Sequence, residues 1–141
     1  MTINDDATLK KILETARTVA SVGVSSSEEK PSYGIFGYLR AHGYHMIPVN
    51  PTAAMIQGIR SYPDLLALPE KVDVVQVFRK SEDVPPVVEK AIQIGAKVVW
   101  MQEGVINEAA ARRAEAAGLQ VVMDRCMRQT HRRLLGEAHH S

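Results

Sequence analysis

The chain has 141 residues, 45% of them hydrophobic, and its 17 basic and 16 acidic side chains give a formal net charge of +1. A chain of this length buries roughly 70% of its unfolded surface, so we expect a single domain over residues 1–141. The charge balance excludes a basic face for nucleic acid, the single cysteine excludes a disulfide framework or a cysteine-based zinc site, and no run approaches membrane-spanning length.

The N-terminal region MTINDDATLKKILETA has neither the basic start nor the apolar core of a signal peptide. Together with the lone cysteine, which fits a reducing compartment, it predicts a cytoplasmic protein. Asp6 or Thr8 is the expected cap of a helix over residues 6–16, whose apolar positions form one stripe. This helix is expected to pack beside a sheet.

The next stretch, TVASVGVSSSEEKPSYGIFGY, has the pattern of a strand, a loop and a helix. Residues 18–24 are short, β-branched and apolar, and residues 25–30 form a polar loop. Ser32 is the expected N-cap of the helix that follows, and Gly43 is its expected stop. Such a turn in an α/β sheet offers backbone N–H groups and a helix dipole to a phosphate, so the stretch points to a nucleotide or coenzyme.

The dinucleotide fingerprint is broken in this turn. Gly23 is placed for a tight turn or a close ligand approach, but Ser25 stands where G-x-G-x-x-G requires its second glycine. A nicotinamide-binding domain would carry an acid at the end of the second strand for the ribose hydroxyl, and this chain has Asn50. Gly37, inside the helix, is expected where that helix lies close against the sheet.

The remaining pattern alternates strands and helices. We expect strands at 44–49, 72–78, 96–102 and 119–124, a short edge strand at 58–62, and helices at 64–68, from Ser81 or Asp83 to Ile94, and at 107–117. This pattern predicts an α/β, Rossmann-like, doubly wound and mainly parallel sheet of five to six strands with helices on both faces. The first strand is expected to be central, and the strand order to reverse beside 72–78, where a ligand crevice would open.

Three strand ends are expected to meet at that crevice, and a fourth lies next in line. Arg79 is the most attractive charge there, because a guanidinium can hold a phosphate with two hydrogen bonds, although a solvated or capping arginine is the alternative. Lys30 can also approach a phosphate, and its alternative is a solvated loop lysine beside two glutamates. Glu103 is the one acid at a strand end, expected as a cap or backbone contact rather than a catalyst.

No catalytic or metal constellation is evident. His42 and His45 lie at the wrong end of the sheet for the crevice, and the other three histidines, His131, His139 and His140, are in the tail without metal-ligand spacing. The chain has no triphosphate-binding lysine loop and no G-x-S-x-G elbow. Trp100 is expected in the core. Cys126 is expected as a buried small residue, with disulfide exchange with a thiol ligand as the alternative.

Seven segments in register give the chain a resemblance to a known family. They are SVGVS, KPSYGI, GYHMIPVNP, GIRSYPDL, VDVVQVFR, VVWMQEGVIN and AGLQVVMDRC, which fall within residues 18–126. In these segments the chain resembles the small stand-alone CoA-binding proteins of the YccU-like family. Their domain is similar to the CoA-binding Rossmann domain of succinyl-CoA synthetase α subunits.

The resemblance implies coenzyme A as the ligand, with its ADP part in the crevice. The implied binding residues are Gly23, Val24 and Ser25 at the diphosphate turn, Lys30 and Ser32 toward phosphate, Asn50 and Pro51 beside the nucleotide, Phe78 and Arg79 on the adenine and phosphate side, and Gln102, Glu103 and Gly104 on the far side. A neutral Asn50 suits coenzyme A, because a carboxylate there would repel its ribose 3′-phosphate. Catalytic and metal-binding residues are not implied.

Two features depart from the family pattern. Glu28 and Glu29 place negative charge in the loop near a polyanion, and the C-terminal tail, residues 127–141, matches no motif and is interpreted as a docking helix. The phosphohistidine and nucleotide-grasp domains of the synthetase are absent, so ligase activity does not follow from the likeness.

The first hypothesis for function is therefore a non-catalytic module that binds CoA or an acyl-CoA as a carrier, sensor or regulatory subunit. The alternatives are an enzyme or subunit that acts on a CoA thioester and, disfavoured by Ser25 and Asn50, a nicotinamide-binding oxidoreductase. The acyl group, a protein partner and a homo-oligomer are left open.

Overall fold

The computed structural model describes residues 1–136 and has alternating strands and helices. The main elements are α1 (Asp6–Thr15), β1 (Thr18–Val22), α2 (Pro31–Ala41), β2 (His45–Val49), β3 (Met55–Ile56), β4 (Ile59–Arg60), η1 (Leu65–Ala67), β5 (Val74–Val77), η2 (Ser81–Asp83), α3 (Val84–Gln93), β6 (Val98–Met101), α4 (Glu108–Ala116), β7 (Gln120–Val122) and α5 (Met127–Leu135). None of the helices within this range has the length and apolar character needed to cross a membrane.

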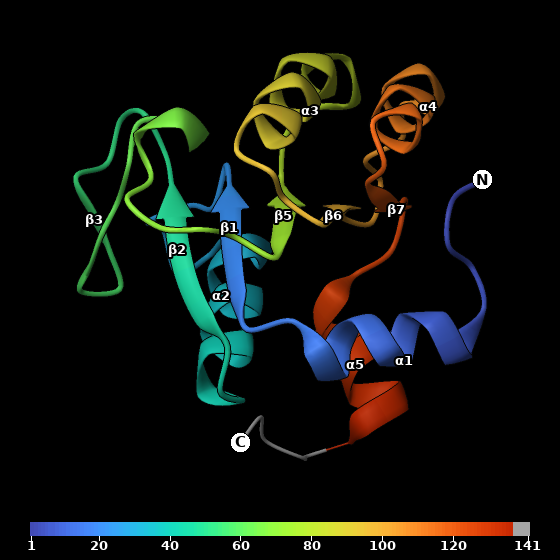
Figure 1. Cartoon of the computed structure of the whole chain (residues 1–141). Coiled ribbons are helices and arrows are strands. Elements are labelled where there is room, and N and C mark those ends of the chain that lie inside the picture. The colour runs from blue at the N-terminus through green and yellow to red at the C-terminus, as the bar shows by residue number, and fades with distance from the viewer. Residues whose placement is uncertain (137–141) are drawn as a thin grey trace.

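Five strands form one parallel sheet in the order β2-β1-β5-β6-β7, as predicted for a Rossmann-like fold (Figure 1). The chain leaves β1 toward β2 on one side and later returns to β5 on the other side of β1. The strand order therefore reverses between β1 and β5, which is where the sequence predicts the crevice. The middle position of the sheet belongs to β5, so the expectation of a central β1 is wrong by one place.

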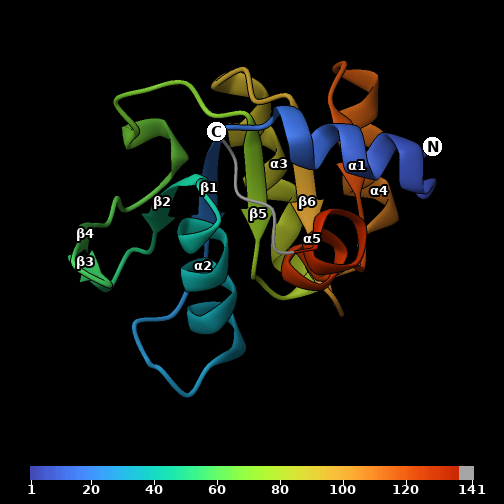
Figure 2. The ribbon, with the colours of Figure 1, turned by 90° about the horizontal axis from the view of Figure 1, so that it is seen from below.

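Helices cover both faces of the sheet and enclose a core on each (Figures 1 and 2). Helices α3 and α4 pack on one face, over side chains such as Val22 and Val77, whereas α1, α2 and α5 pack on the other, over Val19 and Trp100. Strands buried on both faces explain the nearly unbroken apolar runs of the sequence. Trp100 is fully buried in the core, as predicted, and its Nε1 donates to the carbonyl of Arg125 at 2.9 Å.

The segment after β2 differs from the predicted edge strand. Strands β3 and β4 pair with each other as an antiparallel hairpin, and only Tyr62 joins the main sheet, through a bridge to Val49. Gly37 faces this hairpin rather than the sheet, because a Cβ added there would lie 3.2 Å from Oε1 of Gln57. The Nε2 of Gln57 donates to the carbonyl of Tyr33 at 2.9 Å, so the hairpin turn is held against α2.

Helix boundaries lie close to the predicted ones, and the predicted cap of α1 needs a correction. The N-cap of α1 is Asp5, whose carboxylate accepts from the backbone N–H of Thr8, rather than Asp6 or Thr8. Asn107, predicted as the first residue of its helix, is instead the N-cap of α4, and its side chain accepts from the backbone N–H of Ala110 at 2.9 Å. The described part of the tail forms α5, which packs against α1 and α2 of its own chain. The interpretation of the tail as a docking helix concerns residues 127–141, of which 137–141 lie outside the described residues.

Candidate functional site

A cavity of about 360 Å³ opens at the carboxyl edge of the sheet, where β1, β2 and β5 end. Its lining residues are Gly23, Asn50, Pro51, Thr52, Phe78, Arg79, Lys80 and Asp83. Five of these were predicted from the sequence as ligand-binding residues, and they come from three strand ends that are far apart in the chain. The fold therefore brings the first three predicted strand ends together around one space.

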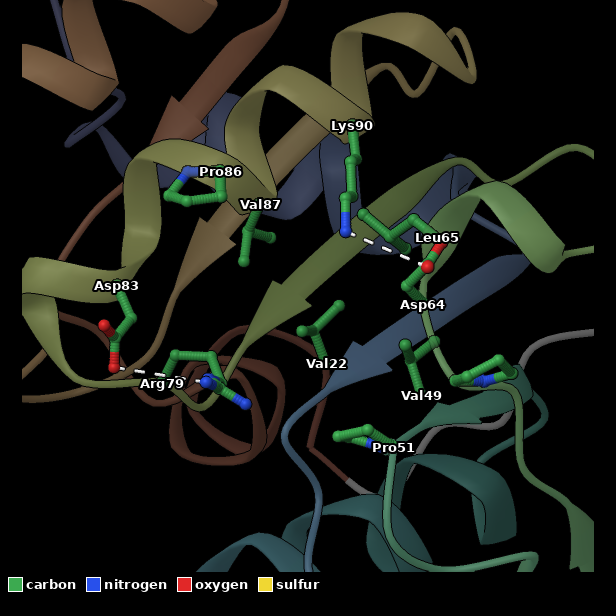
Figure 3. Close-up of a pocket in the computed structure, with 11 residues that line it drawn as sticks. Val22, Val49, Pro51, Asp64, Leu65, Arg79, Asp83, Pro86, Val87 and Lys90 are labelled. Carbon is green, nitrogen blue, oxygen red and sulfur yellow. Dashed lines mark ion pairs between the residues drawn. The ribbon is translucent and has the colours of Figure 1, made fainter.

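A second cavity of about 280 Å³ adjoins the first and shares Pro51, Arg79 and Asp83 with it. Figure 3 shows this cavity between the ends of β1 and β2, the segment before η1, and α3. Its other lining residues are mostly apolar, namely Val22, Val49, Pro63, Leu65, Pro86 and Val87, with Asp64 and Lys90 at one side. The Nζ of Lys90 lies 3.9 Å from the Asp64 carboxylate. An apolar floor with charges at its rim suits a flat ring system attached to phosphates.

Gly23 forms the turn at the end of β1. Its φ of +87° lies in the left-handed region, and a Cβ at this position would be 2.6 Å from the carbonyl oxygen of Phe78 and 2.9 Å from Cδ of Arg79. Its N–H donates to the carbonyl of Val49 at 2.9 Å. Glycine is therefore required by the backbone itself, because the ends of β1 and β5 approach so closely.

Asn50 joins two loops that border the cavity. Its Nδ2 donates to the carbonyl of Val24 at 3.0 Å, and its Oδ1 accepts from the backbone N–H groups of Thr52 and Ala53 at 2.8 and 3.2 Å. The Thr52 hydroxyl donates to the same oxygen at 2.9 Å. One neutral side chain thus ties the loop after β1 to the loop after β2. This structural role was missed in the sequence, where Asn50 was considered only as a neighbour of the ligand.

The loop between β1 and α2 projects beyond the helices (Figure 2). Ser32 does not cap α2 as predicted, because the N-cap is Lys30, which makes no side-chain capping bond. The Ser32 hydroxyl instead accepts from the backbone N–H of Ser25 at 2.9 Å and holds the loop closed. Val24 is fully buried, and its carbonyl accepts from Asn50, so a contact between Val24 and a ligand stays a prediction. Lys30 is exposed, as are the loop glutamates Glu28 and Glu29.

Arg79 stands at the junction of the two cavities. Its Nη2 lies 4.0 Å from the Asp83 carboxylate one turn further on, and both side chains are partly exposed (Figure 3). A long ion pair between exposed groups contributes little to stability, so the guanidinium can exchange this partner for a ligand oxyanion. Lys80, next in sequence, is exposed and also lines the larger cavity.

The predicted far-side residues follow β6, one strand beyond the cavities. Glu103 and Gly104 are exposed, and the N–H of Gly104 donates to the Asp124 carboxylate at 2.7 Å. Gln102 is only 3% exposed, and its Oε1 accepts from the backbone N–H of Met127 at 3.0 Å. A contact between the ligand and these residues stays a prediction, and Gln102 is already engaged in the interior of the protein.

Gln102 belongs to a buried polar chain that sequence reasoning did not identify. Gln76 in β5 donates from Nε2 to Oε1 of Gln102 at 3.1 Å and accepts from the hydroxyl of Ser21 in β1 at 2.9 Å. The chain links β1, β5 and β6 to the start of α5, directly beneath the carboxyl edge of the sheet. A glutamine within the apolar run VDVVQVF is the sequence signal that could have revealed it, because buried polar groups require partners.

The other candidate side chains lie away from the cavities. Cys126 is buried, as the simpler prediction had it, and precedes α5. His42 and His131 pack together beside Tyr38 on the α2 and α5 side of the sheet. His139 and His140 lie outside the described residues. Within residues 1–136, no three His, Cys, Asp or Glu side chains are grouped so as to hold a metal ion.

Known proteins are similar to this chain in sequence. A family model described as a CoA binding domain matches residues 17–132. The Bacillus subtilis protein YneT is 34% identical over 125 residues, covering 89% of this chain and 93% of that protein. The ADP-forming acetate–CoA ligase II of Archaeoglobus fulgidus is 30% identical over 101 residues, but the match covers 70% of this chain and only 15% of the ligase.

A solved structure has nearly the same backbone. A hypothetical protein from Pyrococcus horikoshii OT3 superimposes with a TM-score of 0.93 at 39% sequence identity, covering 96% of this chain and 97% of that one. The small relatives thus have the extent of this chain, whereas the match covers only a small part of the large ligase.

Proposed function

Because the chain belongs to the CoA-binding domain family, we propose that it binds coenzyme A or an acyl-CoA as a non-catalytic carrier, sensor or regulatory module. The ADP part of the ligand occupies the two adjoining cavities at the carboxyl edge of the sheet. The observation that carries this proposal is the meeting of Gly23, Asn50 and Arg79, from three separate strand ends, around one space.

The chemistry of the two cavities suits the parts of this ligand. The apolar floor formed by Val22, Val49 and Leu65 can accept an adenine ring, with Pro51 at the edge that both cavities share. Arg79 and the turn at Gly23 lie where the diphosphate would pass. The predicted contacts from Val24, Ser25, Lys30 and Ser32 would come from the loop that follows, and those from Phe78 and the residues 102–104 would complete the site.

A binding role agrees better with the lining than a catalytic one. Among residues 1–136, no serine, cysteine or histidine lines either cavity. The two acids that do, Asp64 and Asp83, are partly exposed and lie near Lys90 and Arg79. Asn50, the neutral residue at the end of β2, also fits a ligand with a 3′-phosphate better than one with a free ribose hydroxyl. We do not propose for this chain the ligase activity by which the large relatives are named.

The test is a comparison of ligands at equal concentration by thermal melting and calorimetry. A ligand that binds only the folded protein stabilises it by RT ln(1 + [L]/Kd), about 2.7 kcal/mol at 100 times Kd. We expect CoA to raise Tm more than dephospho-CoA, and NAD to leave Tm unchanged. If acetyl-CoA raises Tm as much as CoA does, the acetyl group makes no contact with the protein that affects binding. If no CoA species shifts Tm, the proposal is wrong.

A further inference from the structure

Arg128 lies in the first turn of α5 and faces the first turn of α2. Its Nη1 would be 3.3 Å from a Cβ added to Gly34, so the guanidinium rests over a position that has no side chain. Arg128 is partly buried, and its Nε is shielded from solvent without a hydrogen-bond partner. Within residues 1–136, its guanidinium takes part in no ion pair.

This arrangement is unusual for an arginine of this protein. Arg133, on the same helix, forms two hydrogen bonds with the Asp6 carboxylate at 2.9 and 3.0 Å, and Arg113 binds Glu89 in the same way. A shielded guanidinium N–H without a partner costs free energy, because its hydration is lost and not replaced. Arg128 is therefore held in a position from which an anion would relieve that cost.

The facing turn of α2 has complementary properties. This helix of 11 residues begins after Lys30 without a side-chain cap. Pro31 has no N–H, and the N–H of Tyr33 donates to the carbonyl of Lys30 at 3.0 Å. The first N–H groups of a helix and the positive end of its dipole favour an oxyanion. Nη1 of Arg128 therefore lies beside the first turn of a helix whose dipole favours an anion there.

We propose that Arg128 binds a phosphoryl oxygen of a diphosphate ester that lies over the first turn of α2. The inference deepens the proposed function, since it names a residue of α5 as part of the CoA site. Arg79 approaches the turn at Gly23 from β5, on the side of α3, whereas Arg128 approaches α2 from the opposite face of the sheet.

The test compares Arg128→Gln with Arg112→Gln by calorimetry, using CoA and inorganic pyrophosphate as probes. Arg112 is an exposed arginine of α4 on the other face of the sheet, so its variant controls for the loss of one charge. We expect Arg128→Gln to bind CoA about 10 to 100 times more weakly, as for the loss of a charged hydrogen bond, and Arg112→Gln to bind like the wild type. Pyrophosphate binding should fall in the same variant alone.

Stability separates this role from a structural one. Because the unliganded Arg128 has no partner to lose, Arg128→Gln should have a Tm no lower than that of the wild type; a lower Tm together with unchanged CoA affinity would assign Arg128 to packing. Equal CoA affinity in the two variants overturns the inference and leaves the proposed function intact. If the wild type binds no CoA, the proposed function is wrong and the pyrophosphate titration tests the inference by itself. Pyrophosphate binding that is lost in Arg128→Gln supports the inference, and pyrophosphate binding that is absent or does not depend on Arg128 overturns it.

Discussion

A Cβ on Gly23 would lie 2.6 Å from the carbonyl oxygen of Phe78, closer than two such atoms approach in a relaxed structure. The contact joins the ends of β1 and β5, the two strands between which the order of the sheet reverses. The glycine is therefore needed to form the crevice before any ligand arrives. The sequence predicts a glycine here for the approach of a ligand, and the close contact between β1 and β5 is a second, structural reason for it.

Gly23→Ala should lower the free energy of unfolding by about 2–4 kcal/mol, through left-handed backbone strain plus overpacking against Phe78. Gly95→Ala is the matched control, because Gly95 also has a positive φ, +75°, but a Cβ there would meet no atom within 4 Å. The control should lose only about 1–2 kcal/mol. Urea unfolding measures both, and equal losses would show that the contact with Phe78 relaxes at no cost.

Arg79→Ala should weaken CoA binding by about 1.5–3 kcal/mol, the range for a hydrogen bond to a charged group. Stability should change by less than about 0.5 kcal/mol, because the 4.0 Å pair with Asp83 is exposed. Calorimetry and thermal melting report the two quantities separately. Unchanged CoA affinity would remove Arg79 from the site.

Asp83→Asn makes the complementary prediction. The carboxylate of Asp83 lines both cavities and competes with a ligand oxyanion for Arg79. Its neutralisation should strengthen CoA binding, by up to about 1 kcal/mol for an exposed pair. Titrations at low and at high salt check the cause, because the difference between the variant and the wild type should shrink as salt screens the charges.

The sequence predicted the elements of the site better than their supporting contacts. Strand ends and the reversal of strand order follow from local patterns of apolar residues, so the meeting of Gly23, Asn50 and Arg79 was predictable. The partners of Gln76 and the position of Arg128 over α2 were not, because they depend on how β6 and α5 pack against segments distant in sequence. Ser32 shows the same limit: its hydroxyl binds the loop at Ser25 instead of capping its own helix.

Asn50→Asp should impair both folding and binding. The carboxylate would lose the donor that reaches the carbonyl of Val24 at 3.0 Å, and would place two oxygens near one another. Leaving that carbonyl without its partner predicts a loss of about 1–3 kcal/mol in stability. The added charge should reduce affinity for CoA more than for dephospho-CoA, because the latter lacks the 3′-phosphate. Calorimetry with both ligands tests this difference, and an equal reduction would place the 3′-phosphate away from Asn50.

Asp73 supplies a prediction about pH at the opposite edge of the sheet. Its Oδ2 accepts from the backbone N–H groups of Arg17 and Thr18 at 2.8 and 3.1 Å, and Nζ of Lys97 lies 3.5 Å from its Oδ1. Partial burial alone would raise the pKa of this carboxyl, but the two N–H donors and Lys97 together hold the pKa below its ordinary value. The carboxylate therefore joins the start of β1 to the start of β5.

A carboxyl whose pKa is lower in the folded state stabilises the protein above its unfolded pKa, near 3.9, and loses that contribution as pH falls through the folded value. Asp73→Asn should thus lower the free energy of unfolding by about 1–2 kcal/mol at pH 6.5, because a neutral amide oxygen accepts more weakly than a carboxylate. At pH 3 and below, the difference from the wild type should shrink, since the wild-type group becomes protonated. Urea unfolding at both pH values measures it. CoA affinity at pH 6.5 should be unchanged, because Asp73 lies at the amino edge of the sheet. If the difference in unfolding free energy between the variant and the wild type is the same at both pH values, the hydrogen-bond geometry, and not the charge of Asp73, causes it.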